Sequence, residues 1–220
     1  QLPATATYAL PAPVAGAKAV TLSLCADTPN ELLTITGPGG GDLVLNPGQQ
    51  YIVRVVTNSA SPTCDDNPVY VKINSNIKYT GTAATIDQLP QFVFLAGSNA
   101  GSRVSIHIDN SVSRLDGIYA NRGTNGAATL LTCAQRAGTP LSSLVAMDSN
   151  ECGNRLQVNG AIVLGARLHP YRAFGHGQAG NTDPAETFNL RADTTLSDFM
   201  RDHSSSQLEV VNQRELAPRF

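Results

Sequence analysis

The chain carries little charge, no tryptophan and no long apolar run. Charged residues make up 15 % of its 220 residues, and the formal net charge of −2 comes without a basic cluster. This charge pattern is poorly suited to binding nucleic acid or an anionic membrane surface. No apolar run approaches the roughly 18–20 residues of a spanning helix, so the sequence predicts no membrane span. The lack of tryptophan also argues against a long cleft that stacks sugar rings.

Signatures of nucleotide and serine chemistry are missing too. The glycine run at 37–41 is followed by neither Gly-Lys-Ser/Thr nor a helix start, so it is no phosphate loop. Residues 97–101 read G-S-N-A-G and miss the nucleophile pattern G-x-S-x-G by one position. We interpret both segments as turns.

The histidines are scattered. His107 alternates with Ile106 and Ile108, which predicts a strand position facing solvent. His169 precedes a proline, and His176 and His203 lie in polar segments. None has carboxylate or cysteine partners at ligand spacing, so we expect neither a metal site nor a cofactor.

Carboxylates offer the one enzymatic alternative. Polysaccharide-cleaving solenoids gather acids from adjacent coils onto one exposed sheet. Asp109 and Asp116 flank one expected coil, and Asp148 and Glu151 lie further along the chain. All four neighbour Asn, Ser or Gly, where aspartates more often stabilise turns. The prediction is therefore that the chain is not an enzyme.

The four cysteines form two sequential pairs, Cys25 with Cys64 and Cys133 with Cys152. None belongs to a C-x-x-C motif, and no histidine sits at zinc-finger spacing from them. Two disulfides are favoured over free thiols, and each would stabilise the fold by about 3–4 kcal/mol. Disulfides imply an extracellular or cell-surface location. The chain has the cysteine pairs of an exported protein but shows no export signal, so we expect it to be the mature form of an exported protein.

What the chain does contain is short β-type runs separated by small polar residues. Hydrophobic residues make up 41 % of it. Alternating runs such as 69–73 and 104–108 end at Asn, Asp or Gly, as the corners of a β-solenoid do. The predicted fold is all-β and solenoid-like, with a β-sandwich as the alternative.

One short sequence pattern occurs twice. Asp116-Gly117 and Asn159-Gly160 each interrupt a strand-like run, and the two glycines lie 43 positions apart. An Asn-Gly step predicts either a tight hairpin or a corner between sheets. At roughly 20 or more residues per coil, the spacing would correspond to two coils.

Three regions are expected. Residues 1–18 form a proline-rich extended arm, in which residues 5–10 could pair as an edge strand, dock on a neighbouring copy or stay flexible. Residues 19–67 form a small β unit, and residues 68–220 form the solenoid with a last strand at 207–211. Thr139-Pro140 predicts one short helix inserted between Cys133 and Cys152. His176, Gln178 and Asn181 lie in a Gly-rich segment, which makes them a candidate binding loop.

Six segments carry a family resemblance. They are L-D-G-I-Y-A at 115–120, T-C at 132–133, V-N-G-A-I-V-L-G-A-R-L at 158–168, R-A-F-G at 172–175, P-A-E-T-F-N-L at 184–190 and R-E-L-A-P-R-F at 214–220. Together they resemble uncharacterised exported, cell-surface β-rich proteins of candidate-phyla (Patescibacteria-type) bacteria, at the level of pattern over 68–220. The resemblance implies a bacterial surface protein and transfers no active site.

These observations favour a non-enzymatic structural or adhesive surface protein, a subunit of an appendage or filament. Its partners would be other copies of itself or another surface protein, because a solenoid has two ends that must be capped or matched. A monomeric glycan- or protein-binding module is the first alternative, and a polysaccharide-cleaving β-helix enzyme is the second.

Overall fold

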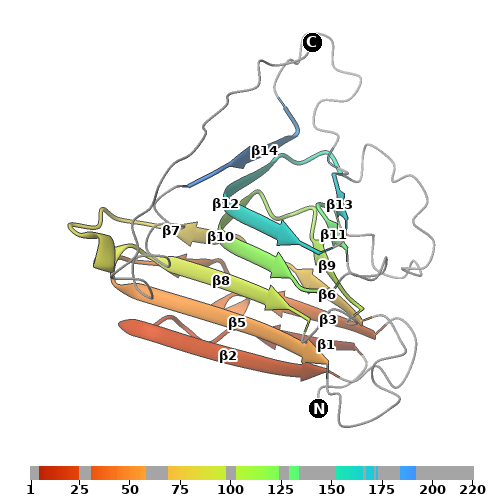
Figure 1. The fold of residues 1–220 in the computed structure, drawn as a ribbon, viewed down its shortest axis with the longest axis horizontal. Helices are drawn as coiled ribbons and strands as arrows, with labels where there is room; N and C mark the ends of the chain where they lie inside the picture. Colours follow the sequence, from red (N-terminus) through yellow and green to blue (C-terminus); the bar gives the residue numbers. More distant parts are fainter. Residues whose placement is uncertain are drawn as a thin grey trace.

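Parallel strands stack on one another and wind into coils (Figure 1). A computed structural model describes residues 5–24, 31–57, 69–97, 103–123, 129–133, 152–165, 167–170, 172 and 184–191. Every strand pairing among these residues is parallel. A hairpin-built sandwich would pair its strands antiparallel. The β-solenoid prediction is therefore confirmed and the β-sandwich alternative is wrong.

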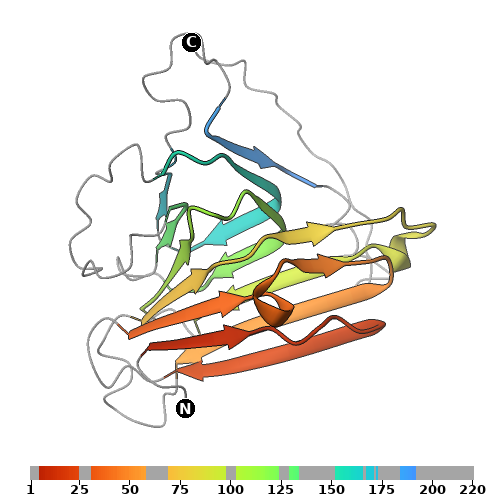
Figure 2. The same cartoon turned by 180° about the vertical axis from the view of Figure 1, so that it is seen from behind.

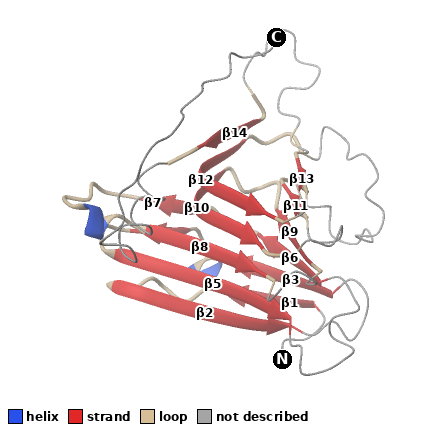
Figure 3. Ribbon diagram, viewed as in Figure 1, coloured by secondary structure: helices blue, strands red, loops and turns tan. Residues whose placement is uncertain are grey.

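The strands belong to two sheets. The first sheet has six strands, prominent in Figure 2, in the order β1 (Thr5–Ala9), β3 (Glu31–Thr36), β6 (Val69–Ile73), β9 (Val104–Ile108), β11 (Leu130–Leu131) and β13 (Leu168–His169). The second sheet follows the order β14 (Glu186–Asn189), β12 (Leu156–Leu164), β10 (Arg114–Asn121), β8 (Gln91–Ala96), β5 (Gln49–Thr57) and β2 (Gly16–Leu24). Two short strands, β4 (Leu43–Leu45) and β7 (Ile77–Tyr79), also belong to this sheet, where β4 pairs with β7 and β7 pairs with β10. Two 3-10 turns, η1 (Pro38–Gly40) and η2 (Ile86–Gln88), are the helical segments drawn in Figure 3.

The second sheet bends along a line of glycines. β10 pairs with β7 at Leu115 and with β8 from Ile118 onward, so its partner changes at Gly117. On β12, only residues 156–159 pair with β14. We call the part formed by β4, β7, residues 114–116, residues 156–159 and β14 the short wall. The long wall is β2, β5, β8, residues 118–121 and residues 161–164.

The two corner glycines are neighbours across one coil. Gly117 pairs directly with Gly160, and Asp116 pairs with Asn159 at a sequence separation of 43. The estimate of two coils was therefore wrong, and so was the hairpin alternative, because β12 runs through Asn159-Gly160 as a corner. Coil length varies, since contacting Ser105 and Thr129 on adjacent coils lie 24 positions apart.

Alternation places the core between the two sheets. In β6 and β8 every second side chain is buried, as a strand with one face toward the core requires. Aromatic rings stack through successive coils of the long wall, where Tyr51, Phe92 and Tyr119 have ring centroids 6.3 and 5.7 Å apart. Each such pair stabilises the stack by about 0.5–1.5 kcal/mol beyond its buried area.

The predicted arm and domain boundary can be placed in this stack. Residues 5–9 of the arm form the edge strand β1, which pairs with β3 of its own chain and leads into the buried Leu10. Strands on either side of the boundary between residues 67 and 68 are hydrogen-bonded neighbours, β3 with β6 and β5 with β8. Both sheets therefore continue across that boundary.

Candidate functional site

Asp116 lies at the corner of β10 and has no exposed side-chain surface. Its Oδ2 accepts a hydrogen bond from the Tyr79 backbone N–H at 2.7 Å, and its Oδ1 accepts one from Asn159 Nδ2 at 2.6 Å. Arg114, two positions earlier on the same face, donates from Nε and from Nη2, the latter at 2.7 Å. A buried carboxylate is stable only when its lone pairs are satisfied in this way. A polysaccharide on the surface therefore cannot reach this carboxylate.

This carboxylate begins a ladder of polar side chains along the corner. Asp116, Asn159 and Asn189 are register partners on β10, β12 and β14. Asn159 Oδ1 accepts hydrogen bonds from Asn189 Nδ2 at 3.0 Å and from Gln157 Nε2 at 2.9 Å. Stacked amides that bond from coil to coil fix the register of the short wall. The site residues Asp116 and Asn159 thus hold the coils together.

The glycines that follow these residues allow the coils to touch. Gly160 has φ +150° and Gly117 has φ +123°. A Cβ on Gly160 would lie 1.9 Å from the Gly117 carbonyl oxygen, and one on Gly117 would lie 2.5 Å from the Phe92 carbonyl oxygen. No other residue fits at this approach distance without moving the backbone of a neighbouring coil.

Asp109 lies directly after β9 and accepts hydrogen bonds within the loop that follows this strand. Its Oδ1 accepts hydrogen bonds from the N–H and the hydroxyl of Ser111, and its Oδ2 lies 3.4 Å from Lys72 Nζ. Burial raises the pKa of Asp109, but the Ser111 hydrogen bonds and Lys72 outweigh it, so the pKa lies below its usual value. Asp109 thus stabilises a turn, which is the role that its polar neighbours in the sequence indicated.

Arg172 is a buried hub beside the disulfide. The sequence named it only as the first residue of the R-A-F-G segment and gave it no role. Its guanidinium donates to the carbonyl oxygens of Thr132 (2.6 Å), Asn110 (2.7 Å), Asp109 (2.7 Å) and Val112 (3.1 Å). Burial lowers the pKa of Arg172 to about 10, so it stays charged at neutral pH. Only the planar fork of arginine can serve so many carbonyls at once.

Glu186 on β14 completes this cluster. Its Oε1 accepts hydrogen bonds from Thr132 Oγ1 at 2.5 Å and from the Arg172 backbone N–H at 2.7 Å. Cys133, next to Thr132, forms the predicted disulfide with Cys152, with their Cα atoms 6.0 Å apart. The cluster brings together Thr132, Arg172 and Glu186, which belong to three of the segments that carried the family resemblance. Their side chains hold loops and strands in place.

His107 corrects a sequence-based expectation. The prediction of a solvent-facing side chain was wrong, because His107 is only 2 % exposed. Its ring meets the Tyr70 ring edge-on, with centroids 5.2 Å apart, and its Nε2 is buried without a hydrogen-bond partner. Burial, aided by the charge of Lys72, lowers the pKa of His107 to about 4, so the ring is neutral at physiological pH. His169 lies at the end of β13, as its position before Pro170 indicated.

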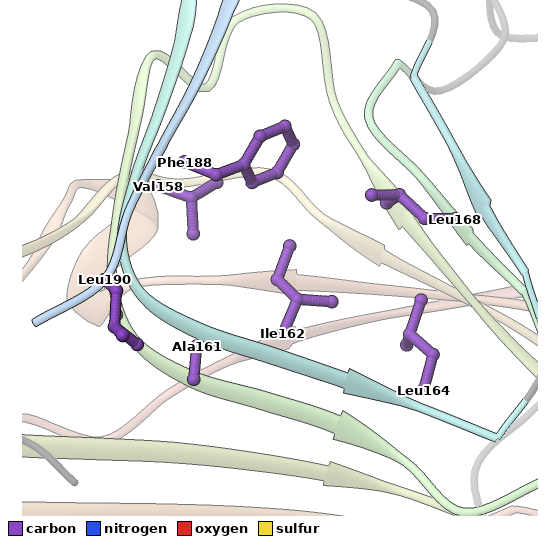
Figure 4. A pocket seen from close by; sticks show the side chains of 8 residues that line it. Val158, Ala161, Ile162, Leu164, Leu168, Phe188 and Leu190 are labelled. Atoms are coloured by element: carbon purple, nitrogen blue, oxygen red, sulfur yellow. The ribbon is translucent and has the colours of Figure 1, made fainter. Parts of the chain in front are cut away.

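An apolar groove lies at the C-terminal end of the stack. It measures about 530 Å³ and is shown in Figure 4. Its lining residues are Val158, Gly160, Ala161, Ile162, Leu164, Leu168, Phe188 and Leu190. Phe188 is 46 % exposed, although its register partner Val158 one coil below is 2 % exposed. Leu168 is likewise 38 % exposed and its partner Leu130 is 0 % exposed. The groove is thus an uncovered piece of core.

A second, more polar cleft of about 410 Å³ crosses the outside of the short wall. Lys78, Arg114 and Arg155 contribute cationic groups from successive coils, and Gln157 and Thr187 add polar ones. Lys78 pairs with Asp42 at 2.6 Å and Arg114 pairs with Asp116 at 2.7 Å, so carboxylates of the chain already balance part of this charge. The cleft therefore gathers positive charge around a hollow.

Several predicted features lie outside the described residues. They are the pair Cys25 and Cys64, the candidate binding loop with His176, Gln178 and Asn181, the residues Asp148, Glu151 and His203, the helix expected after Thr139 and the strand expected at 207–211. In the described ranges, no three His, Cys, Asp or Glu side chains gather so as to hold a metal ion. No helix in that part of the chain is long and apolar enough to cross a bilayer.

No protein-family model, curated protein or solved structure matches this chain.

Proposed function

We propose that the chain is a non-enzymatic structural or adhesive protein of the cell surface, a subunit of an appendage or filament. The observation that carries the proposal is the exposed sheet edge at the N-terminal end of the stack. β2 is nine residues long and pairs with β5 on one side, and no described strand lies on its other side. Lys18 is its one charged residue. Long edges with so little protection are templates for pairing with another chain.

The remaining architecture supports the same conclusion. Coils bonded by backbone ladders and polar side chains form a stiff rod-like unit, and each coil contacts its neighbours only. The Cys133–Cys152 disulfide supports a location outside the cytoplasm. Intact mass with and without reductant tests that location. Purification from the native host with all four cysteines reduced would contradict it.

Association is tested on the β2 edge itself. Ala19→Lys and Thr21→Lys place charges at exposed positions of β2 without entering the core. We expect the native chain to form larger species with rising concentration in light scattering and negative-stain images. The double variant should remain monomeric at the same concentrations. Arg54→Gln on β5, a strand paired on both sides, is the control and should associate normally. A native chain that is monomeric at every concentration would refute self-assembly.

The cationic cleft favours one second candidate, a module that binds an acidic glycan. A chain of sugar carboxylates or sulfates could lie along the cleft and contact Lys78 and Arg155. Titration with acidic and neutral oligosaccharides of equal length would distinguish charge-based binding. Lys78→Gln with Arg155→Gln should weaken it about tenfold or more, while Lys18→Gln at the distant β2 edge should not. Equal binding of neutral and acidic sugars would rule out this candidate.

A further inference from the structure

The outer face of the long wall is apolar. Outward side chains of neighbouring strands are register partners and form two rows across this wall. The first row contains Ala19, Ile52, Val93, Ile118 and Ala161, and the second contains Thr21, Arg54, Leu95, Ala120 and Val163. We call these two rows the apolar face. Arg54 is the one charged residue in them.

The outer face of the short wall, in the same sheet, is polar instead. Its register partners Arg114, Gln157 and Thr187 lie on β10, β12 and β14. Strands that are apolar on both faces, such as Phe92-Val93-Phe94-Leu95 in β8, are typical of parallel sheets that are covered on both sides. The core covers one side of the long wall, so the composition of the wall indicates a second contact on its other side.

The fold leaves this other side open. Ile52, Val93 and Ile118 are half-buried, and Val163 is 58 % exposed. Figure 1 looks onto the long wall with the first sheet behind it, and no described helix or strand lies in front. Single exposed aliphatic side chains are common on proteins, but a continuous patch of them marks a binding surface.

The area of the long wall suits a pair of identical sheets. The wall contains about 30 strand residues, and each covers about 16 Å² of sheet, which gives a face of about 500 Å². Two such faces in contact would bury about 1,000 Å² in total, which is the smallest area expected of a specific interface. A second copy of the chain therefore offers enough surface for a weak but specific contact.

Charge and shape also favour a second copy as the partner. The apolar face carries one cation and no acid, so a partner with several charged groups would lose water at them and find few counter-charges. Two copies whose sheets pack about 10 Å apart, with a two-fold axis along β8, would place β5 over β10 and β2 over β12. Arg54 then lies over Ala120, whose small side chain leaves room for the arginine stem. The two copies of Arg54 stay on opposite sides of the axis.

We propose that the apolar face is a lateral docking surface for a second copy of this chain, which packs its own apolar face against it. The inference deepens the proposed function and rests on it, because it names a second surface through which copies associate. Contacts at the β2 edge would extend the stack of coils, and contacts at the apolar face would join two stacks side by side.

Analytical ultracentrifugation and methyl NMR of the full chain over a concentration series test the proposal. In the native chain, pairing should increase with concentration, and the methyl signals of Val93, Leu95 and Ile118 should shift with it. Val93→Glu with Ile118→Lys places opposite charges on register partners at the centre of the face. The two charges can pair on the free monomer but lose water on docking, so the dissociation constant should rise at least about tenfold. Val44→Glu, beside Lys78 on the short wall, is the matched control and should pair like the native chain.

Two results would overturn the proposal. One is that the Val93, Leu95 and Ile118 methyl signals of the native chain do not change with concentration. The other is that the Val93→Glu, Ile118→Lys variant pairs as strongly as the native chain.

Amide exchange on β2 separates this proposal from the proposed function. Gly16 N donates to Gly48 O on the β5 side, so the alternate amides of Ala19 and Thr21 point toward the open edge. Slow exchange there that persists in the Val93→Glu, Ile118→Lys variant would support edge pairing without the lateral contact. Native pairs that stop at two copies, with fast exchange at Ala19 and Thr21, would support the lateral contact and refute the filament.

Discussion

Replacing Gly160 with alanine is expected to force two coils apart at the corner of the second sheet. The new Cβ would lie 1.9 Å from the carbonyl oxygen of Gly117 and 2.7 Å from its carbonyl carbon. Both atoms belong to the backbone of the adjacent strand, so no side-chain rotation relieves the contact. The backbone at φ +150° also costs an alanine about 1–3 kcal/mol. Overpacking adds about 1–3 kcal/mol, which gives a total loss of about 4 kcal/mol.

Gly48→Ala separates the two contributions. Gly48 also has positive φ, +79°, but a Cβ there meets nothing within 4 Å. Its cost should be the backbone term alone, about 1–2 kcal/mol. Urea denaturation followed by circular dichroism measures the free energy of unfolding of both variants. Equal losses in the two variants would show that the close approach of the coils at Gly160 contributes nothing, and the corner model would be refuted.

Three further predictions follow from buried groups. Since the pKa of His107 falls from 6.5 to about 4 on folding, the unfolded chain binds the extra proton between these pH values. The free energy of unfolding should thus decline by about 3 kcal/mol as pH falls through that window, and His107→Phe should remove this part of the decline in pH-dependent denaturation. Arg172→Lys should cost about 3 kcal/mol in urea, because an ammonium leaves several of its carbonyl partners unsatisfied, and a loss below 1 kcal/mol would contradict the hub. Cys133→Ser with Cys152→Ser should cost about 3 kcal/mol in the same assay through loop closure.

Local patterns predicted the strands better than they predicted the coils. Alternation at 69–73 and 104–108 correctly predicted β6 and β9. In β6 the alternation reflects one buried face, whereas in β9 all five residues are buried. The spacing of 43 was misread because it spans a single coil, and coil length varies. The segment bounded by Cys133 and Cys152 belongs to this coil, between β10 and β12. Local alternation does not distinguish one long coil from two short ones.

The error at His107 has a different cause. Alternation correctly placed His107 on the face of the strand opposite Ile106 and Ile108. The prediction then assumed that this face is exposed to solvent. Ser105 and Leu131, on the same outer face, are also buried. Burial there depends on what covers the outside of the first sheet, which is a tertiary property. Arg172 was missed for a similar reason, since its carbonyl partners come from distant loops.

Substituting Asp116 at the corner and Asp109 in the loop after β9 tests whether these acidic residues stabilise the fold or act as catalysts. Asp116→Asn replaces a carboxylate with one oxygen and one NH₂ group, while the donors from Tyr79, Arg114 and Asn159 remain. At least one buried donor loses its acceptor and Arg114 loses its counter-charge, so unfolding should become about 3 kcal/mol easier. Asp109→Asn keeps an oxygen for Ser111 in a half-buried loop and should cost about 1 kcal/mol or less. Lost glycan cleavage in Asp116→Asn would therefore report a weakened fold, whereas lost cleavage in Asp109→Asn at unchanged stability would be evidence for an enzyme.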